Sequence, residues 1–380
     1  MADARERAVA AKDTPGQAGD LKSEAMTLNM GPQHPSTHGV LRLELVTDGE
    51  IVDDAIPRIG YLHRCFEKHA ENVTYPQVVP FTDRMDYLAS MNNALGYVLA
   101  VEELMEIELP ERVEYLRVIM AELNRIASHL VSFGTYGMDL GAFTPFLFGF
   151  REREEILDLF EMTCGARLLY NYMWVGGGSH DIPPEFVDRS RAFLDGFGDK
   201  ITEYNDLLSH NKIFIERTAN VGVLPLEAAY SYNVTGPNLR GSGVRWDLRR
   251  DDPYSIYDRF EFDIPCGAGE VGTVGDCWDR YMVRIREMAE SARIVKQALD
   301  QLPEGDVHKA VPKNVRTPKE AEAYTRTETP RGELGVYVIS GGKNIPYRVK
   351  VKSPCFTAMS AFQEISRGAF VADIVAIVGS

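Results

Sequence analysis

Two histidines stand four residues apart in the segment GPQHPSTHG, residues 31–39. On a helix, His34 and His38 would share one face and could bind zinc, but the prolines and glycines of this segment oppose a helix. A turn in which one histidine makes a local hydrogen bond is a second interpretation. In a third, a rigid loop between strands presents an imidazole to a cleft, where it can donate a proton near neutral pH.

A second segment, CGAGEVG at residues 266–272, matches the GxGxxG pattern of dinucleotide-binding loops. That fingerprint needs a strand before it, a helix that opens inside it and a βαβ unit around it. Here Pro265 precedes the segment, and the helical pattern begins only after Gly275. The favoured interpretation is a flexible loop, with a nucleotide site as the alternative.

Three further side chains could serve either chemistry or packing. His129 lies beside the apolar face of a predicted helix, where a hydrogen-bonded core histidine is commoner than a ligand. Tyr87 stands near the start of another helical pattern, where the sequence alone favours packing. Asp139, between Met138 and Leu140, is either exposed at a bend or buried with a partner.

The composition suits a large globular chain. Its 380 residues are 44% hydrophobic and 26% charged, enough for one large domain or two smaller ones. The formal net charge of −15 argues against nucleic-acid binding, because that affinity comes mainly from neutralising phosphates. It also argues against direct docking on an anionic membrane surface. Five cysteines without a CxxC pair indicate a reducing compartment, with the cytoplasm as the default.

Four regions are expected along the chain. Residues 1–25 are small, charged and aperiodic, and we interpret them as a solvated tail that a partner could order. Residues 26–80 alternate apolar and polar positions around a DG turn, which predicts a β region carrying the histidine loop. Residues 81–310 predict a helical bundle, and residues 311–380 return to a strand pattern. The fold class is therefore α+β, a central helical bundle flanked by strands.

Apolar spacing places helices inside the bundle. The predicted ranges are approximately 85–105, 110–133, 150–173, 184–209 and 276–302. The C-terminal run VADIVAIVG is strand-sized, and no apolar run approaches the ~20 residues that span a bilayer.

Seven long segments together identify a family. They are MTLNMGPQHPSTHGVLRL, IGYLHRCFEK, RMDYL, RVIMAELNRIASHL, MDLGAFTPFLFGFREREEILDLFE, PRGELGVY and PYRVKVKSP. From about Met26 to its last residue, the chain resembles the 49-kilodalton-type (D) subunit of respiratory complex I, the proton-pumping NADH:quinone oxidoreductase. That family is distantly related to the large subunit of nickel–iron hydrogenases. The resemblance implies a hydrogenase large-subunit-like fold and a core subunit that forms the quinone pocket.

The resemblance also implies roles for single residues. His38 and Tyr87 would hydrogen-bond opposite sides of the quinone head group, and Asp139 would partner the histidine. Such donors stabilise the charge that develops on quinone oxygens during reduction, and a histidine backed by a carboxylate is a tuned proton source. A tyrosine, with an ordinary pKa of ~10, donates only if it is quickly reprotonated. The pocket would be supported by His34, Thr135, Met138 and Arg84, with Arg64 near the cluster of the neighbouring subunit.

The same resemblance implies neighbours for this chain. The substrate would be a quinone, and the chain would bind no metal ion or iron–sulfur cluster, because the terminal [4Fe–4S] cluster belongs to the adjacent B-type subunit. Further partners would be the C-type and ferredoxin-like subunits of the peripheral arm and the membrane-arm subunit at the quinone channel. The complex would lie at the cytoplasmic face of the bacterial inner membrane, with this chain peripheral. A ferredoxin- or deazaflavin-driven quinone reductase is the alternative, and a stand-alone NAD-dependent dehydrogenase is a more distant one.

Three departures from the family pattern carry expectations. Cys65 replaces the usual glycine and is solitary, which excludes nickel–iron chemistry because that site needs four thiolates. Leu169 and Trp174 replace a common histidine and arginine near the cluster. Losing a protonatable cation there should lower the cluster potential and its pH dependence, which favours menaquinone over ubiquinone. Relatives usually carry a further tail beyond Ser380, so either this chain is shortened or its contacts near the cluster differ.

Overall fold

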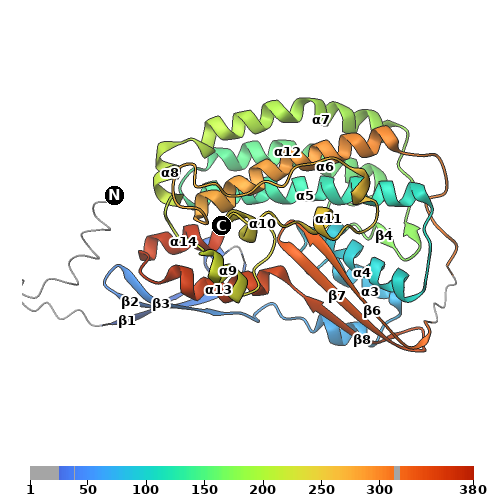
Figure 1. The fold of residues 1–380 in the computed structure, drawn as a ribbon, viewed down its shortest axis with the longest axis horizontal. Coiled ribbons are helices and arrows are strands. Elements are labelled where there is room, and N and C mark those ends of the chain that lie inside the picture. Colours follow the sequence, from blue (N-terminus) through green and yellow to red (C-terminus); the bar gives the residue numbers. More distant parts are fainter. Residues whose placement is uncertain (1–24, 38, 312–316) are drawn as a thin grey trace, which may run out of the picture.

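The computed structural model describes residues 25–37, 39–311 and 317–380. A layer of long helices lies over two separate three-stranded sheets (Figure 1). The α+β class expected from the sequence is confirmed. The described elements are, in chain order, β1 (Met26–Met30), η1 (Pro35–Thr37), β2 (Arg42–Asp48), β3 (Ile51–Arg58), α2 (Phe66–Ala70), α3 (Tyr75–Thr82), α4 (Ser90–Leu104), α5 (Glu111–Asp139), α6 (Thr144–Cys164), β4 (Met173–Trp174), β5 (Gly177–Gly178), α7 (Glu185–Tyr204), η2 (Asn205–Ser209), α8 (Lys212–Thr218), α9 (Leu226–Ser231), α10 (Pro237–Gly241), α11 (Leu248–Asp251), η3 (Tyr257–Arg259), α12 (Cys277–Gln301), β6 (Lys319–Thr329), β7 (Gly332–Gly341), β8 (Pro346–Lys352), α13 (Pro354–Ser366) and α14 (Val371–Gly379).

The N-terminal sheet has the strand order β1-β2-β3 and packs against the end of the chain. The turn predicted at DG is present, since β2 ends at Asp48 and β3 begins at Ile51. Alternate side chains of β2 are buried, and Leu43 and Leu45 share a hydrophobic cluster with Ile374 of α14. The first and last elements of the chain therefore share one core, next to the main core of the helical layer.

The central helix α5 is longer than the sequence predicted. The expected end near residue 133 was wrong, because the helix continues to Asp139 through Gly134 and Gly137. A Cβ at Gly134 would lie 2.9 Å from the Cα of Phe146, and one at Gly137 would lie 3.0 Å from a methyl group of Leu208. These glycines allow neighbouring elements to approach α5 closely rather than ending it.

The other predicted helices of the bundle are present, although α4 begins at Ser90 rather than near residue 85, which leaves Tyr87 in the turn before it. The range 150–173 was displaced, because α6 begins at Thr144 and ends at Cys164. Gly165 then takes a left-handed conformation with φ of 75°, a common helix terminator. The ranges 184–209 and 276–302 agree with α7 plus η2 and with α12.

The C-terminal region contains helices as well as the expected strands. β6, β7 and β8 form an antiparallel meander, with α4 packed against β6 and β7. The strand-sized run VADIVAIVG is instead helix α14, so that expectation was wrong. Short, wholly apolar runs carry no periodicity that separates a buried helix from a buried strand. Among the described residues, no helix is both long and apolar enough to cross a bilayer.

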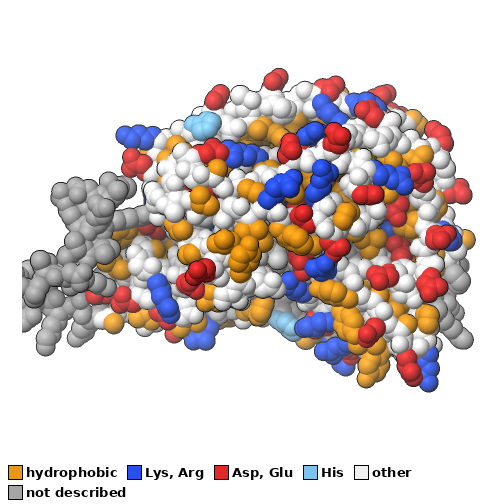
Figure 2. Space-filling view, in the orientation of Figure 1, with side chains coloured by type: hydrophobic (Ala, Val, Ile, Leu, Met, Phe, Trp, Pro, Cys, Tyr) orange, Lys and Arg blue, Asp and Glu red, His pale blue; other side chains and the backbone are white. Residues whose placement is uncertain are grey.

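Charged and apolar side chains divide the visible surface. Figure 2 shows acidic and basic side chains intermingled over the helical layer, while hydrophobic side chains gather in a band across the middle of the same face. Large exposed apolar patches mark interaction faces on soluble proteins.

A buried ionic network holds the helical layer to the C-terminal sheet. Its acids and arginines are at most 1% exposed and come from α5, α10, α11, α12, β6 and the N-cap of α11. The members are Glu122, Arg125, Arg240, Asp247, Arg249, Glu287 and Glu328. Arg240 is the centre, with Glu328 at 2.9 Å and Glu287 at 2.5 Å. His129 donates to or accepts from Glu287 at 2.9 Å, so it is the hydrogen-bonded core histidine that the sequence favoured.

The network is not neutral by simple counting. Four carboxylates face three arginines, and burial lowers the pKa of His129 to about 4, so the imidazole is neutral at pH 7. Burial also holds the pKa of Glu328 above its ordinary value, although Arg240 opposes this. The arginines are therefore essential, because each one removed leaves buried carboxylates without a counter-charge.

Replacing Arg240 with methionine should reduce the free energy of unfolding by about 3–5 kcal/mol, because Glu287 and Glu328 lose their guanidinium. Chemical unfolding measures this loss. Arg326→Met is the control, since its pair with Asp252 is partly exposed and should contribute less than about 1 kcal/mol. Equal losses in both variants would contradict the assignment of the network as the fixed centre of the fold.

Candidate functional site

The histidine segment forms a closed loop between β1 and β2, which we call the finger (residues 31–39, with residue 38 outside the described part). Thr37 donates to the carbonyl of His34 from its backbone N–H at 3.2 Å and its hydroxyl at 2.9 Å. The N–H of Ser36 donates to Nδ1 of His34 at 3.3 Å. Gly31 has φ of +87°, and a Cβ there would lie 2.0 Å from the carbonyl oxygen of Leu41. These contacts support the interpretation that His34 shapes the loop.

Helix α14 lies against both the finger and α5. It packs on η1, which is part of the finger, and on the last turns of α5. The hydroxyl of Tyr136 donates to the carbonyl of Ala376 at 3.1 Å. A Cβ at Gly379 would lie 2.6 Å from the Tyr136 ring and 3.8 Å from Oδ2 of Asp139. Asp139, the half-buried last residue of α5, is therefore on the side of α5 that α14 covers. His38, predicted to bind the quinone, lies outside the described residues.

Tyr87 combines a fixed backbone with an accessible ring. It belongs to the turn between α3 and α4, where its carbonyl accepts from the hydroxyl of Ser90 at 3.2 Å. The preceding Asp86 accepts from the N–H of Leu88 at 3.2 Å and pairs with Arg331 at 3.3 Å. The side chain of Tyr87 is nevertheless 53% exposed. A tyrosine that served only packing would bury its ring, so the exposed ring of Tyr87 calls for another explanation.

Two of the predicted support residues lie beside Asp139 on α5, and the predicted arginines do not. Thr135 and Met138 lie on the last turns of α5 with Asp139, at helical spacing. Thr135 is half-buried and donates to the carbonyl of Val131 at 2.7 Å. Arg84 and Arg64 are exposed, and the contacts of the described residues join neither to this group.

The surroundings of Tyr87 contain an arginine that the sequence did not single out, Arg331, which pairs with the neighbouring Asp86. Burial raises the pKa of the Cys355 thiol, with Arg331 and Arg284 opposing it, although the residue is exposed to solvent.

Charge interactions link Arg331 to its neighbours. Burial disfavours the charge of Arg331, but Asp86, Cys355 and Tyr87 raise its pKa above the ordinary value. Arg284, on α12, acts electrostatically on both Arg331 and Tyr136. The motif PRGE could have signalled Arg331, whereas Arg284 looks like any charged residue of an amphipathic helix.

The CGAGEVG segment is a packed loop. No strand precedes it within residues 260–272, and α12 begins only at Cys277. The N–H of Gly269 donates to the carboxylate of Asp279 at 3.1 Å, and a Cβ at Gly267 would lie 2.0 Å from the carbonyl oxygen of Gly241. These glycines permit close backbone packing, and residues 260–277 do not form the frame of a dinucleotide site.

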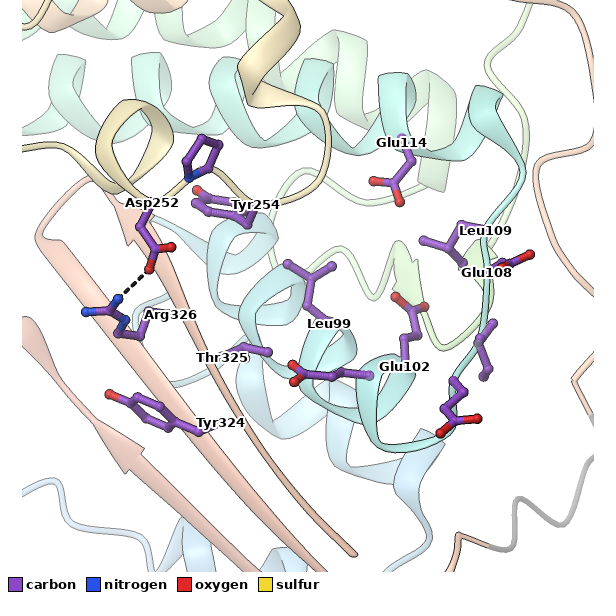
Figure 3. Close-up of a pocket in the computed structure, with 14 residues that line it drawn as sticks. Leu99, Glu102, Glu108, Leu109, Glu114, Asp252, Tyr254, Tyr324, Thr325 and Arg326 are labelled. Atoms are coloured by element: carbon purple, nitrogen blue, oxygen red, sulfur yellow. Dashed lines mark hydrogen bonds and ion pairs between the residues drawn. The ribbon is translucent and has the colours of Figure 1, made fainter.

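A separate cavity of about 620 Å³ lies between α4, α5 and β6 (Figure 3). Acidic side chains dominate its walls, among them Glu102 and Glu114, and Arg326 pairs with Asp252 at its edge. None of the predicted site residues that the structure describes lines it. In the described part of the chain, no three His, Cys, Asp or Glu side chains come together as a metal site.

Comparison with known proteins identifies the family. Residues 139–380 match the family described as respiratory-chain NADH dehydrogenase, 49 Kd subunit. The chain is 55% identical to the D-type subunit of NADH-quinone oxidoreductase from Chlorobaculum tepidum, over 95% of this chain and 91% of that protein. The corresponding proteins of Chlorobium luteolum and Chlorobium phaeobacteroides are 55% and 56% identical over the same share of this chain, which covers 92% and 91% of them. This chain belongs to the 49-kilodalton subunit family.

The backbone at Cys65 is one that a glycine would adopt more readily than a cysteine. Cys65 precedes α2 with φ of 55° and ψ of 39°, a left-handed conformation that glycine adopts freely. Its Sγ lies 3.9 Å from Nδ1 of His63, and the thiol is exposed. A cysteine in this left-handed conformation is mildly strained, and the strain lies in the backbone just before α2.

The segment with Leu169 and Trp174 is anchored by a buried carboxylate. Leu169 and Asn171 both have positive φ, at 58° and 46°. The N–H of Asn171 donates to Oδ2 of Asp83 at 2.7 Å, and the carbonyl of Asn171 accepts from the Trp174 indole at 2.9 Å. Burial raises the pKa of Asp83 to about 6, against the opposing hydrogen bond from Asn171 and charge of Arg84.

This raised pKa predicts a pH-dependent stability. The folded protein binds a proton that the unfolded chain has released, so stability falls as pH rises from 3.8 toward about 6 and remains reduced above that. Asp83→Asn keeps an acceptor for Asn171 and removes the charge. It should raise the free energy of unfolding near neutral pH by on the order of 2 kcal/mol and change it little near pH ~4. Unfolding titrations at both pH values test this, and an equal gain at both would indicate packing instead.

Proposed function

We propose that this chain is the quinone-site core subunit of a proton-translocating NADH:quinone oxidoreductase. Its relatives in Chlorobaculum and Chlorobium are named as the D-type subunit of NADH-quinone oxidoreductase, and the similarity covers most of both chains. In this proposal the chain forms one wall of the quinone pocket, and the B-type subunit with the terminal iron–sulfur cluster forms the other. The C-type, ferredoxin-like and membrane-arm subunits are the remaining neighbours, at the cytoplasmic face of the membrane.

One observation carries the assignment of the reacting groups. A rigid finger and the Asp139 end of α5 both pack on α14, while Tyr87 presents an exposed phenol from a hydrogen-bonded turn. Groups on fixed backbones with accessible polar ends suit a site that must hold a head group from two sides.

The chemistry that follows is proton-coupled reduction. Two electrons arrive one at a time from the cluster of the neighbouring subunit, and two protons are needed to complete the hydroquinone. In the proposal, His38 with Asp139 supplies a proton at one oxygen and Tyr87 supplies the other. Tyrosinate must then regain its proton, for which the exposure of the Tyr87 side chain gives access to water.

Removing either proton donor should separate quinone reduction from the earlier electron steps. His38→Ala or Tyr87→Phe should lower NADH:quinone activity of the assembled complex by about a hundredfold, because positioned acids contribute that much. NADH:ferricyanide activity should remain, since ferricyanide accepts electrons before they reach the quinone site. Tyr347→Phe, which alters a tyrosine 70% exposed on β8, is the matched control.

Two outcomes would count against the proposal. Equal losses of quinone and ferricyanide activity would point to a structural role for the finger and the turn. Unchanged quinone activity in both variants would remove them from the site.

We further propose menaquinone as the quinone. Leu169 cannot titrate, and Trp174 carries no charge, so neither side chain offers a proton coupled to reduction of a nearby cluster. Without such a cation the cluster is harder to reduce, and a low-potential cluster suits a low-potential quinone.

A potentiometric titration of the terminal cluster at several pH values tests this. The potential should change little with pH in the natural complex, and Leu169→His should make it fall more steeply, because an imidazole can take up a proton on reduction. Asp83→Asn separates any contribution from the nearby buried carboxyl. A steep fall in the natural complex that Asp83→Asn leaves intact would sink the idea.

A further inference from the structure

The turn that carries Tyr87 is held by side chains that donate to its backbone. The hydroxyl of Ser90 donates to the carbonyls of Asp83 at 2.8 Å and Tyr87 at 3.2 Å. The side-chain amide of Asn93 donates to the carbonyl of Asp86 at 3.0 Å. Both donors belong to α4, the helix that follows the turn. They therefore fix the shape of the turn, but they do not tie it to the rest of the protein.

A buried side chain of α5 makes that tie. Asn124 is 1% exposed, and its Nδ2 donates to the carbonyl of Leu88 at 3.1 Å, while its Oδ1 accepts from the N–H of Met91 at 3.0 Å. Leu88 directly follows Tyr87 in the chain. One partner accepts and the other donates, so only a side chain that offers both a donor and an acceptor meets both needs, as an amide does.

The same contact completes the start of α4. The first N–H groups of a helix have no partner inside the helix, and a side chain at the N-cap usually accepts from one of them. The N-cap of α4 is Ala89, whose methyl group cannot accept a hydrogen bond. The oxygen of Asn124 takes this role from a neighbouring helix, because Met91 is the second residue of α4. The position of the α4 start, and of the turn before it, thus follows that of α5.

An ion pair also reaches the turn from outside α4, but it is the weaker tie. Arg331 pairs with the carboxylate of Asp86 at 3.3 Å, and the two side chains are 24% and 27% exposed. Solvent screens pairs of this kind, so they contribute little. The bonds of Asn124 lie in the buried contact between α4 and α5, where a hydrogen bond is stronger and its loss leaves a buried polar group unpaired.

We propose that Asn124 is a positioning residue that holds Tyr87 in place for quinone reduction. The inference rests on the proposed function, in which Tyr87 gives a proton to one quinone oxygen. The helix that carries Asn124 ends at Asp139, the group proposed for the other side of the head group. One continuous helix therefore sets the positions of both sides, and Asn124 passes that position on to the Tyr87 turn.

The test is a double-mutant cycle on the intact complex. Asn124→Leu keeps about the same side-chain size and removes both hydrogen bonds, and it is made alone and together with Tyr87→Phe. Asn92→Leu is the matched control. Asn92 is 2% exposed and donates to the carbonyl of Ala121 on α5 at 3.1 Å, a bond that does not involve the Tyr87 turn. The kcat and KM for quinone and the NADH:ferricyanide rate are measured for each variant.

We expect Asn124→Leu to lower kcat for quinone by about tenfold, because a small displacement of a reacting group slows the reaction strongly. The KM for quinone and the ferricyanide rate should stay within about twofold, since the change acts on the orientation of one donor. In the Tyr87→Phe background, Asn124→Leu should change kcat by less than about twofold, because the group that it positions is already gone. Asn92→Leu should stay within about twofold in both backgrounds.

The other outcomes count against this role. Equal losses of quinone and ferricyanide activity in Asn124→Leu would indicate a general structural role. Losses from Asn124→Leu and Tyr87→Phe that multiply would mean that Asn124 acts independently of Tyr87. Either result would overturn the inference. If Asn124→Leu fails to assemble, Asn124→Ser decides by the same criteria, because its shorter side chain cannot reach both partners but leaves room for water.

Failure of this inference is distinguishable from failure of the proposed function. A normal kcat in Asn124→Leu, with Tyr87→Phe still defective in quinone reduction, would remove Asn124 from the mechanism and leave the proposed function standing. If Tyr87→Phe is fully active, the proposed role of Tyr87 fails, and the role of Asn124 fails with it.

Discussion

The packing of α14 is the contact on which the arrangement of the site depends. This helix covers the buried face of the N-terminal sheet, touches the finger and meets the last turn of α5. Close approach is possible because Gly379 leaves room for the Tyr136 ring. Without α14, the finger would be an isolated excursion from a three-stranded sheet, with no defined distance to Asp139. The chain thus brings together two segments more than a hundred residues apart by using its last element as a spacer.

The buried ionic network gives the other half of the site its rigidity. Arg240 and its carboxylates link α10, α12 and β6, and β6 leads directly into the turn that carries Arg331. Arg284 lies one turn before Glu287 on α12, so its position follows from the same network. A buried ion pair adds little stability over apolar residues of the same volume, but removing one partner is costly, so the network resists any arrangement that separates its charges. The network therefore keeps α10, α12 and β6 in one arrangement, and the turn after β6 carries Arg331 next to Asp86 and Tyr87.

Much of this architecture could be predicted from the sequence, and the failures share a physical cause. The alternation around DG and the apolar spacing of α7 and α12 report burial of one face, and those elements were found where expected. The end of α5 and the helical state of α14 were missed because tertiary packing decides them: glycines serve close contacts, and an apolar run suits either buried state. Tyr87 and Asp139 entered through family resemblance, since their local patterns favour packing. Arg284 could not be found at all, because only the fold reveals that its Nε is buried without a hydrogen-bond partner in the described part of the chain.

The two sides of the proposed site are held differently, and this difference bears on the chemistry. Asp139 ends α5 where α14 covers it, whereas Tyr87 extends a 53% exposed ring from a turn whose Asp86 pairs with Arg331. A group that packing holds keeps its geometry while a substrate enters and leaves. An exposed phenol can exchange protons with water, so in the proposed reaction Tyr87 is the donor that water can reprotonate directly.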